Sequence, residues 1–295
     1  MSQTNSIIAQ APYPVEGNLP VNMTNDLLFH LLLQDEDSKD ILKGIISAFY
    51  EIAFEDIRSV IVTNPISYGD TIDSKEMVLD IKAILNDYSI INLEMQVNNY
   101  KNWPERSISY LCRCFDNLKP GDGYVSVKGA YHIGFLNYTL FDDTPDFFAT
   151  YSIRNDVTNR LYSSKFRISV IDLTLIDKAT DEDKCHHRDL WAYFFKATTW
   201  EEIHMLATKD QNIHTAASKL FKITEDQKIR DEIWAREDHI RCMNDFNNYY
   251  KNEIAERDAA ISAKDAVISA KDTLLDKYSS FLKAQGFNPE DVINS

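Results

Sequence analysis

The sequence has few cysteines, and their arrangement excludes one class of protein. Its 295 residues include four cysteines at irregular positions: Cys112, Cys114, Cys185 and Cys242. Small secreted scaffolds rely on paired cysteines at regular spacing, so a disulfide framework is not expected. We therefore expect a reducing, cytoplasmic location. A zinc site is not expected either, because Cys185-His186-His187 has no second pair of ligands at zinc spacing.

Long apolar runs and the common catalytic motifs are also missing. No run of about 18 apolar residues occurs, so we expect no membrane-spanning helix. The first 20 residues are polar and lack a basic start followed by an apolar core, so residues 1–21 are expected to form a flexible leader rather than a secretory signal. No Walker loop, G-x-S-x-G elbow or H-E-x-x-H motif is present, which argues against P-loop, serine-hydrolase and zincin chemistry.

Positive charge is scarce overall but unevenly distributed. The chain has 31 Lys and Arg against 46 Asp and Glu, a formal charge of −15, which argues against a uniformly basic surface. Residues 101–170, however, contain nine basic and seven acidic residues. A locally basic face for nucleic acid is therefore compatible with an acidic chain.

The periodicity predicts helices at both ends and strands between them. Helices are expected near 25–33, 38–50 and 104–118, the first capped by Thr24 or Asn25. Strands are expected at 59–64, 77–85, 90–97, 125–127, 131–137, 147–153 and 166–175. From residue 181 onward the pattern is helical. This order predicts a core sheet with flanking helices.

Three polar side chains stand out in the hairpin predicted over 77–97. Asp80 lies on its first strand, and Glu94 and Gln96 lie two apart on its second. Residues two apart on a strand share a face, so pairing of the strands would bring the three together. Two carboxylates brought together suit Mg²⁺. An exposed hairpin face is the alternative, but the apolar neighbours favour groups that need a partner or a metal.

The last helical segment contains an internal repeat of seven residues. Ala259–Asp265 is repeated almost exactly by Ala266–Asp272, and one heptad position is apolar throughout: Ile254, Ile261, Ile268, Leu275 and Leu282. Such a repeat predicts either a coiled coil that joins copies of the chain through residues 251–286, or one amphipathic helix docked on its own domain. In this segment, the second heptad position of a coiled-coil interface is often Ala or Lys rather than a large apolar residue, so the oligomeric state stays open.

A set of short motifs resembles the PD-(D/E)XK nuclease superfamily, in its Rpn branch of recombination-promoting nucleases and transposase-like proteins. The resemblance covers about residues 22–176. The motifs are Thr24-Asn25-Asp26-x-x-Phe29, Leu79-Asp80-Ile81-Lys82-Ala83, Asn92-Leu93-Glu94-Met95-Gln96, Arg106-Ser107-x-Ser109-Tyr110, Gly121-x-Gly123-Tyr124 and Ile133-Gly134-Phe135-Leu136. The resemblance implies an α/β fold of the restriction-endonuclease type, with a mixed central sheet flanked by helices.

The resemblance also implies roles for the acidic residues. Asp80 and Glu94 would bind Mg²⁺, with Mn²⁺ as a substitute. Asp26 matches the family's early acid and would complete the metal site; its alternative role is that of a first-turn acid favoured by the helix dipole. Gln96 stands where other superfamily members have Lys, as is typical of this branch, and it carries no positive charge.

Basic and aromatic side chains complete the implied site. Arg106 and Tyr110 on the helix after the hairpin would contact DNA phosphates or support the site. The same role, DNA binding or site support, is expected of Lys82. The chain departs from the family at His30, where Lys is usual, which would weaken a basic contact there.

The sequence thus predicts a Mg²⁺-dependent DNA endonuclease, linked to recombination or mobile elements. The expected parts are a nuclease-like domain at 22–178, a helical region at 179–250, a heptad-repeat helix at 251–286 and a tail at 287–295. One alternative is a catalytically degenerate DNA-binding protein that retains the fold. Another is an assembly protein built on the coiled coil.

Overall fold

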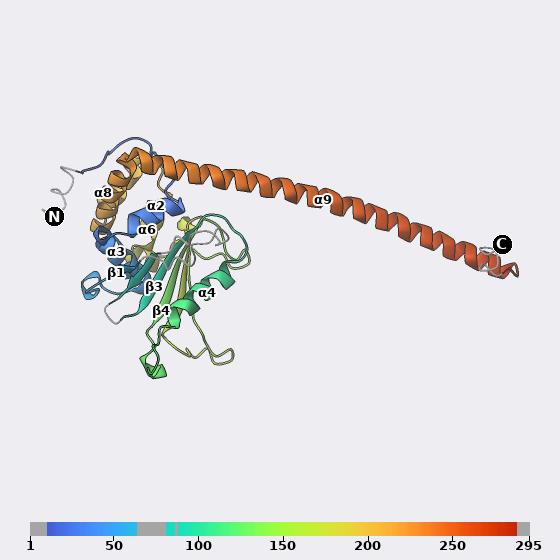
Figure 1. The fold of residues 1–295 in the computed structure, drawn as a ribbon, viewed down its shortest axis with the longest axis horizontal. Helices are drawn as coiled ribbons and strands as arrows, with labels where there is room; N and C mark the ends of the chain where they lie inside the picture. The colour runs from blue at the N-terminus through green and yellow to red at the C-terminus, as the bar shows by residue number, and fades with distance from the viewer. Residues whose placement is uncertain (1–10, 64–80, 86–87, 288–295) are drawn as a thin grey trace. The chain divides into compact units, whose positions relative to one another are not determined.

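The computed structural model describes residues 11–63, 81–85 and 88–287, and it combines one mixed sheet with helices (Figure 1). Its strands are β1 (Ile61–Thr63), β2 (Ile81–Ile84), β3 (Ile90–Gln96), β4 (Ala130–Leu136), β5 (Phe148–Tyr151) and β6 (Phe166–Asp172). Its α-helices are α2 (Asp26–Leu33), α3 (Lys39–Tyr50), α4 (Trp103–Phe115), α5 (Asp181–Cys185), α6 (Arg188–Lys196), α7 (Trp200–Ala207), α8 (Gln211–Glu225) and α9 (Gln227–Ala284).

The sheet has the strand order β1-β2-β3-β4-β6-β5. Its centre is parallel, because β3 pairs with β4 and β4 pairs with β6 in the same direction. The pairs β1–β2, β2–β3 and β5–β6 are antiparallel. The expected mixed central sheet flanked by helices is therefore confirmed.

Helices cover both faces of the sheet, which explains why the central strands are apolar on both sides. On one face, Leu93 and Phe135 belong to a large core shared with α2, α3, α6 and α8. On the other face, Leu136 and Val170 pack under Trp103 in a smaller core beneath α4. We call this second face the α4 face. Figure 1 shows α4 on the side of the sheet opposite to α2, α3 and α6.

The N-terminal end of α2 follows the predicted capping. The side chain of Asn25 accepts hydrogen bonds from the backbone of Leu27 and Leu28, so Asn25 rather than Thr24 caps the helix. Asp26 is consequently the first residue of α2, where the helix dipole favours an acid.

Two details predicted around α4 and β4 are wrong. Residues 124–126 form a short 3₁₀ helix instead of a strand at 125–127, and Val125 is 91% exposed. The spacing of Ile108, Leu111, Cys112 and Phe115 predicts one apolar face for this helix. In α4, Trp103 and Leu111 face the core, whereas Ile108 and Cys112 are exposed. The α4 face is therefore anchored by fewer and larger side chains than the periodicity indicates.

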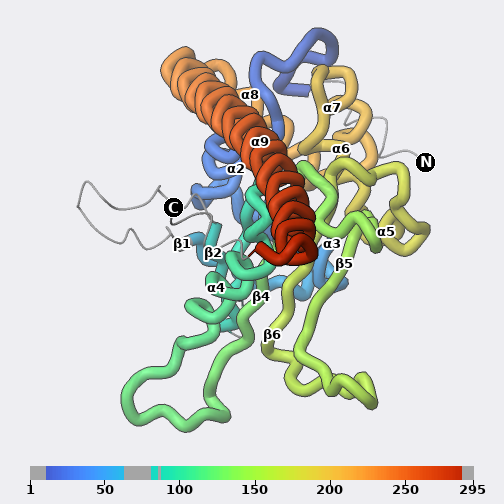
Figure 2. Tube along the Cα trace, turned by 90° about the vertical axis from the view of Figure 1, so that its right-hand side faces the viewer, coloured from blue at the N-terminus to red at the C-terminus, as the bar shows by residue number. Residues whose placement is uncertain are grey.

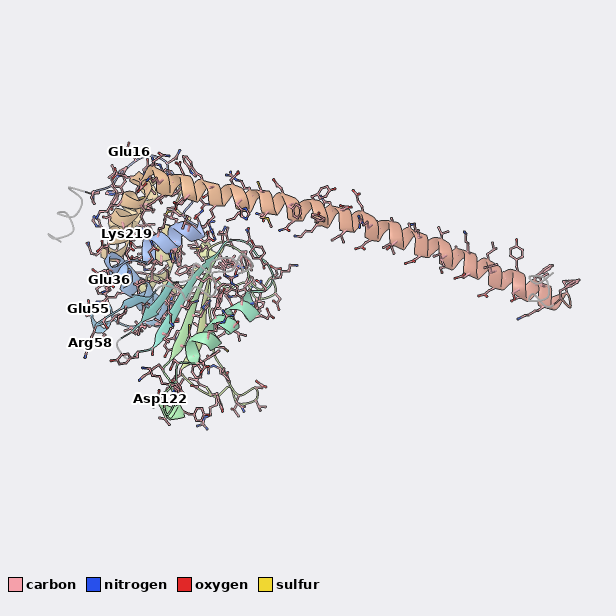
Figure 3. All side chains as sticks on the ribbon, viewed as in Figure 1. Glu16, Glu36, Glu55, Arg58, Asp122 and Lys219 are labelled. Carbon is pink, nitrogen blue, oxygen red and sulfur yellow. The ribbon has the colours of Figure 1, made fainter. Side chains whose placement is uncertain are left out.

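The chain divides into two compact units, residues 1–236 and 237–295. The described part of the second unit is the continuation of α9 and the turn after it. Its heptad residues Ile254, Ile261 and Ile268 are each about half exposed, and side chains project from all sides of this helix (Figure 3). No described helix has the length and apolar character needed to cross a membrane.

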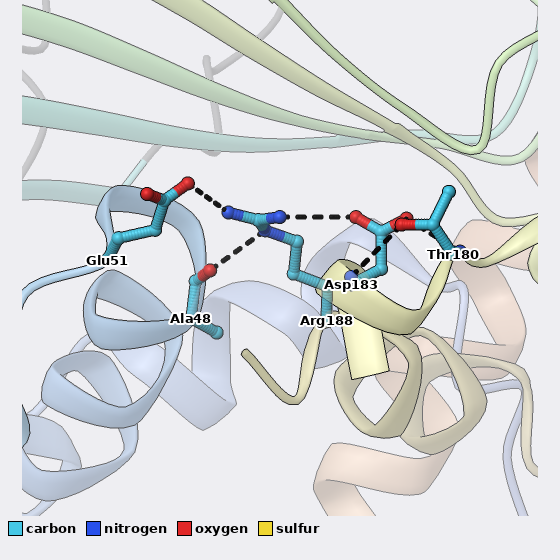
Figure 4. Close-up of polar contacts among 5 residues, drawn as sticks. All are labelled: Ala48, Glu51, Thr180, Asp183 and Arg188. Atoms are coloured by element: carbon cyan, nitrogen blue, oxygen red, sulfur yellow. Dashed lines mark hydrogen bonds and ion pairs between the residues drawn. The ribbon is translucent and has the colours of Figure 1, made fainter. Parts of the chain in front are cut away.

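A buried arginine joins α6 to α3 and α5 in the first unit (Figure 4). Arg188 is 2% exposed. It donates to the backbone oxygen of Ala48 (2.9 Å) and pairs with Asp183 (3.2 Å) and Glu51 (2.7 Å). Its guanidinium also lies 4.2 Å from the ring centre of Phe148. The arginine thus satisfies three acceptors at once, one in α3, one at the C-terminal cap of α3 and one in α5.

Removing this arginine should destabilise the fold. We expect Arg188→Met to lower the free energy of unfolding by about 2 kcal/mol, because buried Asp183 loses its cation. The value lies below the usual range for a broken buried pair, since Thr180 still donates to Asp183. The measurement is urea denaturation. Glu51→Gln is the matched control: Glu51 is half exposed, so its loss should cost less than about 1 kcal/mol. Equal losses in the two variants would contradict the prediction.

Candidate active site

Strand β3 presents three buried polar side chains to the α4 face. Asn92, Glu94 and Gln96 alternate with apolar residues that enter the large core, and each of the three is less than 10% exposed. The strand is buried along its whole length because helices cover both faces. Glu94 is therefore a carboxylate held inside the sheet rather than on an exposed hairpin.

An arginine from α4 is a charged partner of Glu94. Arg106 Nη2 lies 2.7 Å from Glu94 Oε1, and the glutamate side chain is 4% exposed while the arginine is 36% exposed. The guanidinium lies 5.2 Å from the ring centre of Tyr110, one helical turn further on. Arg113 approaches the same ring at 5.8 Å. Tyr110 thus lies against the arginine that reaches the buried carboxylate.

A buried histidine flanks the second oxygen of Glu94, and the sequence-based prediction did not include it. His132 on β4 is fully buried. Its Nδ1 accepts from Asn92 Nδ2 (3.1 Å), because an amide nitrogen can only donate, so the ring proton lies on Nε2. Nε2 is 3.8 Å from Glu94 Oε2. Burial, together with the Arg106 cation, lowers the pKa of His132 to about 3. The imidazole is therefore neutral and does not form an ion pair with Glu94, whereas Arg106 does.

The neutral state of His132 predicts a pH-dependent stability. The unfolded chain binds a proton at this residue below its ordinary pKa of 6.5, whereas the folded chain does not do so until about pH 3. The free energy of unfolding should therefore fall by about 1.4 kcal/mol per pH unit as the pH drops through this range. Between pH 7 and pH 5 this amounts to about 2 kcal/mol.

Urea denaturation of the wild type and His132→Gln at both pH values checks this expectation. The variant lacks the titrating ring, so its loss on acidification should be smaller by that amount. An identical loss in both proteins would contradict the prediction, because it would mean that folding leaves the pKa of His132 unchanged.

The indole of Trp103 covers this part of the sheet. Its ring centre lies 5.3 Å from that of His132. Gly134, which pairs with Glu94 in the register of β3 and β4, leaves the space that the indole occupies. The start of α4, and with it Arg106, is thus held close to β3 and β4.

Further polar groups lie at the carboxyl ends of the parallel strands. Gln96, Leu136 and Asp172 are aligned across β3, β4 and β6. Gln96 Nε2 donates to Asn98 O (2.9 Å). Within the described residues, Gln96 Oε1, Asp172 Oδ2 and the Tyr138 hydroxyl are buried without a hydrogen-bond partner. Burial, then the charge of Glu94, raises the pKa of Tyr138; Asp172 acts in the same direction and Arg106 opposes them.

Asp26 has a different partner from the other predicted acids. Arg236 binds its carboxylate through two contacts, Nε–Oδ1 at 2.6 Å and Nη2–Oδ2 at 2.7 Å. Among the described residues, the three Asp, Glu, His or Cys side chains that lie close enough to share one ion are Glu51, Glu182 and His186. Within the described residues, Asp26 and Glu94 do not belong to a group of three possible metal ligands around one point.

Two other predicted residues lie on or before β2. Asp80 lies outside the described residues. Lys82 is half-buried and stands opposite Asn92 in the antiparallel register, on the strand next to Glu94.

The bases that follow α4 lie away from this edge. Lys128 and Lys165 precede β4 and β6, so they stand at the amino ends of the strands, whereas Gln96 and Asp172 stand at the carboxyl ends. A strand of seven residues is about 20 Å long. The loops at the amino ends, one of which carries Asp122, extend to the same side (Figures 2 and 3). Lys128 and Lys165 are therefore far from Glu94, whereas Arg106 contacts it.

The donor set at the carboxyl edge fits a hard divalent cation. Glu94 offers a buried carboxylate, and Gln96 Oε1 is a buried oxygen without a hydrogen-bond partner among the described residues. Oxygen ligands of this kind suit Mg²⁺ and Mn²⁺, and no sulfur ligand lies among these residues.

The strand order and the buried carboxylate on β3 define a restriction-endonuclease-like fold. The chain belongs to the PD-(D/E)XK nuclease family transposases, since the model of that family matches residues 23–251. Neither the curated proteins nor the solved structures include a significant match to the chain. Membership of this family supports a nuclease-type function.

Proposed function

We propose that the chain is a Mg²⁺-dependent DNA endonuclease that hydrolyses phosphodiester bonds, linked to recombination or mobile elements. The observation that carries the proposal is the buried Glu94 carboxylate on β3, beside Gln96 and within the match to a nuclease family. A carboxylate kept at 3% exposure costs stability, and a role in cation binding explains why the fold retains it.

In this proposal Glu94 and Asp80 hold the cation, and Asp26 is a third candidate ligand. The place of Asp80 rests on the sequence, where it precedes β2 by one residue. A bound divalent cation would polarise the phosphodiester and lower the pKa of a water molecule. Gln96 orients groups at the cation, and neutral His132 limits the positive charge around Glu94.

Arg106 would bind the DNA phosphate from α4, while Tyr110 keeps its guanidinium in place and Lys82 adds a positive charge from β2. Arg106 is the partly exposed member of its ion pair, so a phosphate can reach it. A guanidinium matches phosphate geometry well, and binding should weaken with salt.

The organisation beyond the nuclease-like domain is part of the proposal. Residues 1–21 form a leader, 22–178 the nuclease-like domain, 179–250 a helical region and 287–295 a tail, in a cytoplasmic protein. Residues 251–286 join copies of the chain, because their heptad residues are exposed in the single chain. Light scattering that gives the mass of one copy would contradict this self-association.

A plasmid-cleavage assay tests the proposed activity. Purified full-length protein should convert supercoiled plasmid to nicked or linear forms with Mg²⁺ or Mn²⁺, and EDTA should stop the reaction. Cleavage that persists in EDTA and in Asp80→Ala would refute the assigned site.

The second candidate is a DNA-binding protein that has lost catalysis. It is favoured by specific contacts: Arg106 pairs with Glu94, and Arg236 takes both oxygens of Asp26. Gln96 also lacks the positive charge of the usual Lys. Under this reading, Mg²⁺ would not raise the melting temperature, whereas an intact cation site raises it by mass action.

A further inference from the structure

Asp172 lies on the α4 face, at the same edge of the sheet as the candidate site. It is the last residue of β6, and the register aligns it with Leu136 and, through β4, with Gln96. Partners in a parallel register point to the same side, so Asp172 shares the face of Glu94. Two strand spacings, about 10 Å, separate its backbone from β3. Its side chain is 3% exposed.

The two oxygens of this carboxylate have different surroundings. Oδ1 accepts from the backbone nitrogen of Thr174 (2.7 Å) and from its hydroxyl (2.6 Å), a turn typical of Asp and Asn. Oδ2 is buried and has no hydrogen-bond partner in the described part of the chain. The turn requires one oxygen only, and Asn would serve it equally well. Burial of a second, charged oxygen is costly and is not explained by the turn.

Neighbouring groups indicate that Oδ2 belongs to a polar site. Gln96 Oε1 is likewise buried without a described partner, at 6% exposure of its residue. Tyr138, which follows β4, lies within the electrostatic influence of Glu94, Arg106 and Asp172. Acceptor oxygens therefore gather at this edge, whereas Arg106 is the cation that pairs with Glu94. An excess of acceptors is the environment that a hydrated divalent cation requires.

We propose that Asp172 is a further acidic ligand of the candidate site and holds a hydrated divalent cation from the β6 side through Oδ2. This inference rests on the proposed function. The distance between β3 and β6 requires a water molecule or a second cation between Asp172 and Glu94. Mg²⁺ commonly retains several waters, so a carboxylate at this separation can bind its shell.

Titration calorimetry with Mn²⁺ on metal-free, full-length protein tests the proposal. Asp172→Asn keeps an oxygen for Thr174 but removes the charge, and should weaken Mn²⁺ binding at least tenfold. Thr174→Val is the matched control: it weakens the turn but leaves Oδ2 in place, so the Mn²⁺ affinity should stay within about twofold. If Asp172→Asn does not fold, Asp172→Ser, which also retains an oxygen for the turn, is measured instead.

The outcomes separate the two proposals. Wild-type affinity in Asp172→Asn, together with weakened binding in Glu94→Gln, would overturn the role of Asp172 and leave the proposed function standing. Equal weakening in Asp172→Asn and Thr174→Val would also overturn it, because the turn alone would then matter. A wild-type protein that binds no Mn²⁺ would overturn both proposals.

Discussion

Glu94→Gln is expected to reduce Mg²⁺-dependent plasmid cleavage by at least about 1000-fold, equivalent to about 4 kcal/mol in the activation barrier. The amide keeps the size of the side chain and one oxygen for Arg106, which lies 2.7 Å from the wild-type carboxylate. It removes the charge that holds the cation, so the chemical step is lost while the fold remains. Initial cleavage rates at saturating Mg²⁺ measure the effect, and thermal melting in EDTA verifies the fold.

Glu105→Gln is the matched control for this prediction. Glu105 precedes Arg106 on α4, is exposed, and its substitution removes the same single charge. Its cleavage rate should stay within about twofold of wild type, since isolated surface charges have small effects. A rate for Glu94→Gln within tenfold of wild type would contradict the assignment of Glu94 as a cation ligand.

Arg106 connects the proposed chemistry to the fold. In the described residues its cation lies against the carboxylate that would otherwise hold a metal. A bound cation would compete with Arg106 for Glu94, and a DNA phosphate would compete with Glu94 for Arg106. The bracing of Arg106 by Tyr110 then matters, because it limits how far the guanidinium moves when its partner changes.

Local sequence patterns were sufficient to predict part of the site. Alternation along β3 correctly placed Glu94 and Gln96 on one face. The helix predicted near residues 104–118 is present as α4, which carries Arg106, although its apolar face differs from the predicted one. These features depend on residues a few positions apart, which the sequence displays directly.

Other members of the site depend on contacts between distant segments. His132 and Asp172 lie in strands with apolar residues on both sides, and their neighbours at Asn92 and Gln96 are set by the register of β3, β4 and β6. In β4, the polar His132 among mostly apolar residues was the available signal, whereas β6 also contains Arg167 and Ser169, so Asp172 does not stand out in the sequence. The strand wrongly predicted at 125–127 has the opposite cause: Val125 and Val127 favour strands, but no described strand pairs with this segment, and Val125 is exposed.

The second large effect is expected at Gly134, whose missing side chain admits Trp103. A Cβ atom at this position would lie 2.1 Å from Trp103 Cζ2 and 2.6 Å from Cη2. The indole is 1% exposed, so it has no free space into which to move. Gly134→Ala should therefore lower the free energy of unfolding by about 3 kcal/mol or more, through overpacking. Gly123→Ala is the control, because no atom lies within 4 Å of its Cβ, and it should be neutral or slightly stabilising.

A suppressor variant tests the cause of this loss. Trp103→Phe removes the two ring atoms that clash, so the double variant with Gly134→Ala should be more stable than Gly134→Ala alone. Trp103→Phe alone creates a cavity and should lower the free energy of unfolding by about 1 to 3 kcal/mol. Urea denaturation of the four proteins gives the coupling energy. Additive losses would contradict the steric explanation. Since Trp103 begins the helix that carries Arg106, the suppressed double variant should also recover cleavage activity more fully than Gly134→Ala.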